Sequence, residues 1–155
     1  ELQKNMVDIN VVALMHLSHL YGNEMKKRRK GRILNVASVA AFSAGPYMSV
    51  YYASKAFVFS LSQAMYEELK GYGVSVTALC PGPTGTNFEN TAGLTNSKMF
   101  KVFGVEKADS VVKRGYKGMM RGKAIVYHSK VTYGFNIITR LVSRKCARNI
   151  AGRIN

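Results

Sequence analysis

A tyrosine and a lysine four residues apart, Tyr51 and Lys55, form the pair in this sequence whose types and spacing could move a proton. Side chains at positions i and i+4 of a helix share one face, so a helix over Met48–Glu68 would bring the phenol near the ammonium group. A free tyrosine has a pKa of about 10, and a nearby cation lowers that pKa by favouring the phenolate. Because a general acid or base works best when its pKa approaches the working pH, the pair predicts proton exchange between Tyr51 and a substrate.

A serine hydroxyl, Ser38, follows an apolar run over residues 31–37 that is typical of a buried strand. A hydroxyl at the carboxyl end of such a strand can donate to an oxygen on which charge develops. Tyr47 and Tyr52 are alternative phenols, but neither precedes a lysine by four residues. Tyr51 is therefore the predicted acid/base.

Four segments then occur in a fixed order. They are Asp-Ile-Asn at 8–10, Asn-Val-Ala-Ser at 35–38, Tyr-Tyr-Ala-Ser-Lys at 51–55 and Cys-Pro-Gly-Pro-Thr-Gly-Thr at 80–86. A Tyr-x-x-x-Lys pattern alone arises by chance, whereas four segments with the right gaps are specific. Together they resemble the catalytic half of the short-chain dehydrogenase/reductase family.

The resemblance implies roles for individual residues. Ser38, Tyr51, Lys55 and Asn10 would be the catalytic set, with Asn10 in a local distortion of its helix where a backbone carbonyl holds a water that links to the lysine. The cofactor would contact Tyr51, Lys55, Pro81, Gly82, Thr84 and Thr86. Without the resemblance, Asn10 would be interpreted as a buried amide bonded to backbone groups, and the two threonines as residues that stabilise a turn.

The resemblance also implies an α/β fold, a Rossmann-like doubly wound parallel sheet, and hydride transfer between NAD or NADP and a carbonyl or alcohol substrate. NADP is slightly preferred, although the discriminating residues belong to the family's first half. That half supplies a Gly-rich phosphate loop and an Asn-Asn-Ala-Gly segment, and neither has a match here. Residues 1–155 are therefore interpreted as the carboxyl-terminal half of a single dehydrogenase domain, truncated and inactive in isolation.

Hydrophobic patterning predicts the elements that position these residues. A buried helix is expected over Leu2–Tyr21 and a strand over Gly31–Ser38. The catalytic helix should follow a loop at 39–49 and end at Gly71 or Gly73. The remaining predictions are a strand over Val74–Cys80, a helix over Lys107–Arg121, a strand over Lys123–His128 and a last helical stretch over Ser129–Ile150.

Two segments point to a substrate and to a partner. Residues 87–104 are polar with scattered glycines and apolar residues, which suits a movable lid over an apolar substrate such as an acyl chain or a steroid-like ring system.

The apolar arcs of the helices over Leu2–Tyr21 and Met48–Leu69 are too wide for one sheet face to cover. We therefore expect them to form a homodimer or tetramer contact.

The charge is strongly basic, with 23 Lys and Arg against 8 Asp and Glu and a net charge of +15. Cations gather at Lys26–Lys30 and between Lys101 and Arg153. Such a balance raises nucleic acid or an anionic membrane as partners, but no nucleic-acid-binding motif accompanies it, and solvated helix ends explain the first cluster. The basic amphipathic stretch near the carboxyl end is more often a packed terminal helix than a membrane-surface helix.

Cysteine and histidine usage excludes two further classes of protein. Cys80 and Cys146 are too few for a disulfide framework, which favours a cytoplasmic location. His16 and His19 lack the partners of a metal site. Two hypotheses from other classes remain: a catalytically silent dimerisation or packing module, and a basic polyanion-binding protein.

Overall fold

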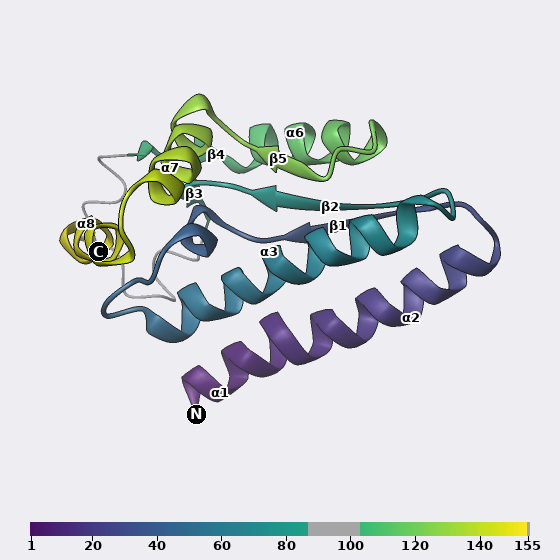
Figure 1. Cartoon of the computed structure of the whole chain (residues 1–155), viewed down its shortest axis with the longest axis horizontal. Coiled ribbons are helices and arrows are strands. Elements are labelled where there is room, and N and C mark those ends of the chain that lie inside the picture. The colour runs from purple at the N-terminus through teal and green to yellow at the C-terminus, as the bar shows by residue number, and fades with distance from the viewer. Residues whose placement is uncertain (87–102, 155) are drawn as a thin grey trace.

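The computed structural model describes residues 1–86 and 103–154. Its centre is a parallel sheet of three strands in the order β1-β2-β5 (Figure 1). The strands are β1 (Gly31–Val36), β2 (Val74–Cys80) and β5 (Ile125–Tyr127). Each parallel step is made through a helix, as parallel pairing requires. The expected fold class is confirmed: the structure is part of a doubly wound Rossmann-type sheet.

Helices cover both faces of this sheet (Figure 1). One face carries α3 (Ser49–Lys70) together with a long rod made of α1 (Leu2–Val7), a π-helical segment (Asp8–Ala13) and α2 (Leu14–Lys27). The other face carries α6 (Ala108–Met120). The first helical rod therefore continues beyond the predicted end at Tyr21.

The central strand β2 is buried on both faces because helices pack against both. Toward α3, Val74 and Val76 pack with Met65 and Leu69. Toward α6, Leu79 packs with Val111 and Val126. This two-sided burial explains why β2 carries no charged residue.

A buried polar chain ties β1 to the two helices below it. Ser18 Oγ donates to Asn35 Oδ1 over 3.4 Å, and Asn35 Nδ2 donates to Ser62 Oγ over 3.0 Å. Ser62 Oγ then donates to the carbonyl of Val58 over 2.6 Å. Since buried polar groups must find partners, these bonds fix the register of α2 and α3 against the strand.

Close contact between α6 and the sheet depends on glycine. A Cβ on Gly115 would lie 2.7 Å from Leu79 Cδ2, and one on Gly118 would lie 2.1 Å from Val126 Cγ2. Both distances are well inside van der Waals contact. Only residues without a side chain let α6 lie this close to β2 and β5.

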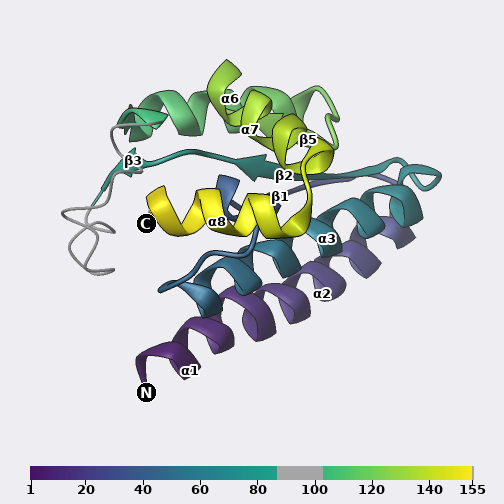
Figure 2. The same cartoon turned by 60° about the vertical axis from the view of Figure 1, so that its left-hand side comes forward.

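Short elements gather at the carboxyl ends of the strands (Figures 1 and 2). β3 (Thr84–Gly85) pairs with β4 (Glu106–Lys107), and α7 (Lys130–Leu141) and α8 (Arg144–Ile154) complete the chain. The prediction of one helical stretch over Ser129–Ile150 was wrong. Val142 is extended, and the side chain of Ser143 accepts from the backbone N–H of Cys146, so a new helix starts there.

Most of the predicted lid at 87–104 lies outside the described residues. Within the described part, no helix combines the length and apolar character that crossing a bilayer requires.

Candidate active site

Ser38 is held just beyond the end of β1. The backbone N–H of Ala37 donates to Leu79 O over 2.8 Å and that of Val39 donates to Pro81 O over 3.0 Å, so the chain stays beside β2 past the last strand residue. Ser38 Oγ accepts from the N–H of Ala40 over 3.1 Å and caps a 3-10 turn at Val39–Phe42. The hydroxyl is thereby placed at the carboxyl edge of the sheet, where the sequence predicts it.

Tyr51 and Lys55 lie on the first turns of α3. The Lys55 Nζ is 5.8 Å from the centroid of the Tyr51 ring and donates to the carbonyl of Val36 over 3.0 Å. A hydrogen bond joins the side chains of Tyr51 and Ser38. The i, i+4 spacing thus puts the phenol and the ammonium group on one side of α3, and the end of β1 places the serine hydroxyl against the phenol.

The electrostatics differ from the expectation that Lys55 lowers the pKa of Tyr51. Burial raises the pKa of Tyr51 above its usual value, and the hydrogen bond from Ser38 only partly opposes that effect. Burial also lowers the pKa of Lys55. The reason is that desolvation disfavours both charged forms, while the ammonium group is directed to the Val36 carbonyl.

Asn10 lies in the π-helical segment Asp8–Ala13, so the expected local distortion of this helix is present. π-Helical turns are rare and often occur at functional sites. Asn10 Nδ2 donates to Ser54 Oγ over 3.2 Å, and Ser54 Oγ donates to the carbonyl of Tyr51 over 2.8 Å. The amide is therefore bonded to the catalytic helix through Ser54, and the water-linked path to Lys55 stays a prediction.

The turn at 81–86 is the other wall of the site. Thr84 Oγ1 donates to Gly82 O over 3.1 Å, and Thr86 Oγ1 donates to Thr84 O over 3.4 Å. These are the local turn bonds that the alternative interpretation of the two threonines expects. The same residues face the cavity, so a turn role and a binding role are compatible.

One cavity of about 380 Å³ brings the predicted residues together. Its lining includes every predicted site residue: Asn10, Ser38, Tyr51, Lys55, Pro81, Gly82, Thr84 and Thr86. Most other lining residues are small or apolar and come from the strand ends and α6, among them Val39, Ala40, Val111 and Val112. Ligands of open α/β sheets bind at this carboxyl edge.

The alternative phenols are elsewhere. Tyr47 is 93% exposed, and Tyr52 is buried with its ring under Gly45, where a Cβ would lie 2.3 Å from Tyr52 Cε2. Tyr52 lines a different cavity, between the loop after Ser38 and α8. Of the three phenols, Tyr51 is the one that lines the cavity with Ser38 and Lys55.

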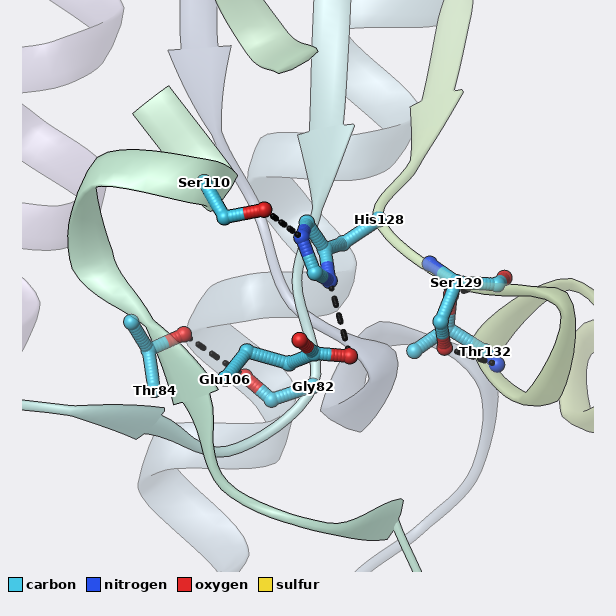
Figure 3. Close-up of polar contacts among 7 residues, drawn as sticks. All are labelled: Gly82, Thr84, Glu106, Ser110, His128, Ser129 and Thr132. Atoms are coloured by element: carbon cyan, nitrogen blue, oxygen red, sulfur yellow. Dashed lines mark hydrogen bonds and ion pairs between the residues drawn. The ribbon is translucent and has the colours of Figure 1, made fainter. Parts of the chain in front are cut away.

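A second polar cluster, which the sequence did not predict, supports the turn (Figure 3). His128, 4% exposed, has its Nε2 3.3 Å from Ser110 Oγ, and its Nδ1 lies 3.1 Å from Glu106 Oε1. The second contact is at ion-pair distance without the geometry of a directed hydrogen bond. Glu106 is paired in β4 with Thr84 of the turn. The only sequence signal was a histidine directly after a short apolar strand.

Comparison with known proteins agrees with this geometry. The family model for short chain dehydrogenases matches residues 1–96. Mouse 17-beta-hydroxysteroid dehydrogenase type 3 is 34% identical over 114 residues, which are 74% of this chain and 35% of that protein. Ketoacyl reductase HetN from Nostoc is 39% identical over 79 residues, 51% of this chain and 28% of that protein.

Solved structures show the same relation. A short-chain dehydrogenase from Sphingobium yanoikuyae in complex with NADPH superposes with a TM-score of 0.74 at 27% identity, covering 90% of this chain and 54% of that one. A 7beta-hydroxysteroid dehydrogenase at 20% identity has a TM-score of 0.78, covers 94% of this chain and 57% of that one, and shows the fold alone. The chain thus spans about half of these structures, and a smaller share of the two curated relatives above. With the motifs, the fold and a family model over residues 1–96, the chain belongs to the short-chain dehydrogenase family.

Proposed function

We propose that this chain carries the catalytic residues of an NAD(P)-dependent oxidoreductase that interconverts a carbonyl and an alcohol. One observation carries the proposal: Asn10, Ser38, Tyr51 and Lys55 line a single cavity together with the turn at 81–86. A dehydrogenase of this kind needs a proton donor, a group that polarises the carbonyl, and a cation near the cofactor. The lining offers a candidate for each role, namely Tyr51, Ser38 and Lys55.

Tyr51 is the proposed general acid and base. In the reductive direction its Oη gives a proton to the substrate oxygen as a hydride arrives at the carbonyl carbon, and in the oxidative direction it takes that proton back. The phenol is in its protonated form at neutral pH, the form that donates in the reductive direction, and burial makes it a weaker acid than a free tyrosine. Ser38, already hydrogen-bonded to the phenol, would donate to the same substrate oxygen.

The cavity fits the nicotinamide end of the cofactor, which supplies or accepts the hydride. The fit rests on the donors at the cavity wall: the ammonium group of Lys55, the phenol of Tyr51 and the hydroxyls of Thr84 and Thr86. Lys55 would hold a ribose hydroxyl, and the turn at 81–86 would hold the carboxamide. The Sphingobium neighbour was solved with NADPH, which supports the slight preference for NADP.

The substrate is proposed to carry apolar bulk. Val39, Ala40, Val111 and Val112 supply apolar lining to the same cavity, and apolar lining binds apolar parts of a ligand. The two curated relatives are named for a hydroxysteroid and a ketoacyl substrate. A steroid-like ring system or an acyl chain therefore remains the proposed class, and the lid at 87–104 remains a proposal.

We further propose that the 155-residue chain is the carboxyl-terminal half of one domain and does not act alone. The chain covers 54% of the Sphingobium structure, and β1 is an edge strand with Val36 49% exposed. An open edge invites another strand. A cytoplasmic location is proposed with it, because neither Cys80 nor Cys146 is in a disulfide.

The second candidate, a packing or dimerisation module, is favoured by one observation. Ile9, Leu17 and Leu20 on the α1–α2 rod are between 51% and 68% exposed. Exposed apolar side chains grouped on one helix face mark an interaction surface. This surface could serve assembly whether or not the chain is catalytic.

The test is NAD(P)H-dependent ketone reduction by this chain and by any longer open reading frame that contains it. Tyr51→Phe should lower kcat at least about a hundredfold, the lower range for general acid catalysis, and weaken cofactor binding much less, because Lys55, Thr84 and Thr86 remain to hold the cofactor. Tyr47→Phe, an exposed phenol on the same loop-helix segment, is the matched control and should change neither. Activity of Tyr51→Phe within tenfold of the parent would refute the assignment.

A further inference from the structure

A second cavity, of about 460 Å³, lies along β5, between α6 and the start of α7. β5 and β1 are the two edges of the three-stranded sheet, so this cavity is at the edge far from β1. Of the described residues, none lines both this cavity and the candidate active site. Any ligand held here would be bound independently of the catalytic residues.

Among the residues that the structure describes, the lining of this cavity is cationic and includes no carboxylate. Its charged members are Arg114, Lys117, Arg121, Lys123 and Lys130. Within residues 1–86 and 103–154, none of these side chains forms an ion pair. Like charges that converge on one hollow repel one another and raise the local concentration of anions.

The helix dipoles explain the position of some of these cations but not of all of them. Lys117 and Arg121 are at the carboxyl end of α6, where cations are stabilised by the helix dipole. Lys130 is the first residue of α7, at the positive end of a helix dipole, where a cation is disfavoured. A ligand anion in the cavity would offset that unfavourable placement.

The start of α7 also offers backbone donors. A capping box gives partners to two of the backbone N–H groups: that of Thr132 donates to Ser129 Oγ over 3.2 Å, and that of Ser129 donates to Thr132 Oγ1 over 3.1 Å. The N–H groups of Lys130 and Val131 come before the first intrahelical bond and have no acceptor within the helix. Open N–H groups at a helix start, with cations around them, form an anion-binding arrangement.

One wall of the cavity is aromatic. Tyr127 and Tyr133 meet edge to face with ring centroids 5.2 Å apart, and Tyr133 is 53% exposed. Tyr127 is fixed by Asn136 Nδ2, which donates to its hydroxyl over 2.6 Å. An exposed ring beside a cationic hollow gives the non-phosphate part of a ligand a surface to pack on.

A second copy of the chain is not a suitable occupant. Two such surfaces face to face would oppose one cationic set with another at close range. An occupant must instead carry concentrated negative charge within about 460 Å³. Phosphate groups meet that requirement, because Arg and Lys bind them with charge-assisted bonds.

We propose that the cavity between α6, β5 and α7 binds a ligand with two or more phosphate groups. The phosphates lie against Arg114, Lys117, Arg121 and the start of α7, and the rest of the ligand lies along Tyr133. The ligand comes either from a free phosphorylated compound or from a lipid headgroup, which share this chemistry. The site lies outside the catalytic cavity and is not needed for the proposed reductase activity.

Isothermal titration with inorganic pyrophosphate at low ionic strength tests the free source. The double variant Arg121→Ala/Lys130→Ala removes one cation from each wall and should weaken binding at least about tenfold. The control Lys145→Ala/Arg153→Ala removes the same charge from exposed positions of α8 and should change affinity less than about twofold. Thermal unfolding checks that both doubles are folded, and Arg121→Gln/Lys130→Gln replaces the first double if it is not.

Vesicle flotation tests the lipid source. Phosphatidylcholine vesicles with phosphatidylinositol 4,5-bisphosphate are compared with phosphatidylserine vesicles of equal surface charge. Binding to either pyrophosphate or the bisphosphate vesicles that is lost in the cavity double and kept in the α8 double supports the site and identifies its source. Equal loss in the two doubles means attraction by net charge and overturns the proposal, as does absence of binding to both probes.

Discussion

Replacing Gly118 by alanine tests how closely α6 must lie on the sheet that carries the active-site edge. The added Cβ would lie 2.1 Å from Val126 Cγ2 and 3.4 Å from Val126 Cβ. Val126 is 6% exposed and β-branched, so it has few alternative rotamers. The helix must therefore move away from β5, or the valine must leave its rotamer.

The magnitude follows from two opposing effects. Overpacking a core costs about 1–3 kcal/mol, whereas alanine in place of glycine inside a helix gains about 1 kcal/mol. Because the close atom belongs to a branched, buried side chain, we expect a net loss of about 1–2 kcal/mol in the free energy of unfolding. For a chain of this size that is a fall in Tm of roughly 2–8 °C.

The assay is thermal and urea unfolding followed by circular dichroism, with Gly134→Ala as the matched control. A Cβ at Gly134, inside α7, meets nothing within 4 Å, so that variant should gain up to about 1 kcal/mol. The double variant Gly118→Ala/Val126→Ala should lose less free energy of unfolding than the two single variants lose in total, by at least about 1 kcal/mol, because the smaller side chain removes the clash. A Gly118→Ala variant as stable as Gly134→Ala would refute the close-packing argument.

Three further predictions concern surfaces and side chains around this core. Leu17→Glu on the exposed face of α2 should convert a dimer at micromolar concentration into a monomer, as measured by light scattering. The control Leu141→Glu, at an 81% exposed position of α7, should leave the dimer intact. A parent chain that is already monomeric contradicts the assembly proposal. His128→Leu should speed hydrogen exchange at the Glu106 amide by at least about tenfold; this amide donates to Pro83 O over 3.0 Å. The control His16→Leu, at an exposed position, should leave that exchange unchanged. Equal protection in both variants would show that His128 does not hold β4. Burial raises the pKa of the Cys80 thiol to about 12, so little reactive thiolate forms there at pH 8. Iodoacetamide at pH 8 should therefore modify the exposed Cys146 and spare Cys80 in the folded chain. Modification of both thiols at equal rates would contradict the burial of β2.

The sequence alone predicted the features that depend on local spacing. Tyr51 and Lys55 share a helix face because they are four residues apart. Gly31–Val36 and Val74–Cys80 are strands because they are short apolar runs, and Gly73 and Pro81 bound the second one. The order of the motifs identified the family, and all the predicted site residues line one cavity.

Tertiary structure alone decided what depends on burial and on contacts between distant segments. The raised pKa of Tyr51 comes from desolvation, which no spacing of residues reveals. Asn10 meets Ser54 across 44 residues, and His128, just after β5, meets Glu106 at the start of β4. The break at Val142 and the cationic cavity along β5 likewise depend on packing, because the sequence records which side chains exist but not which of them converge in space.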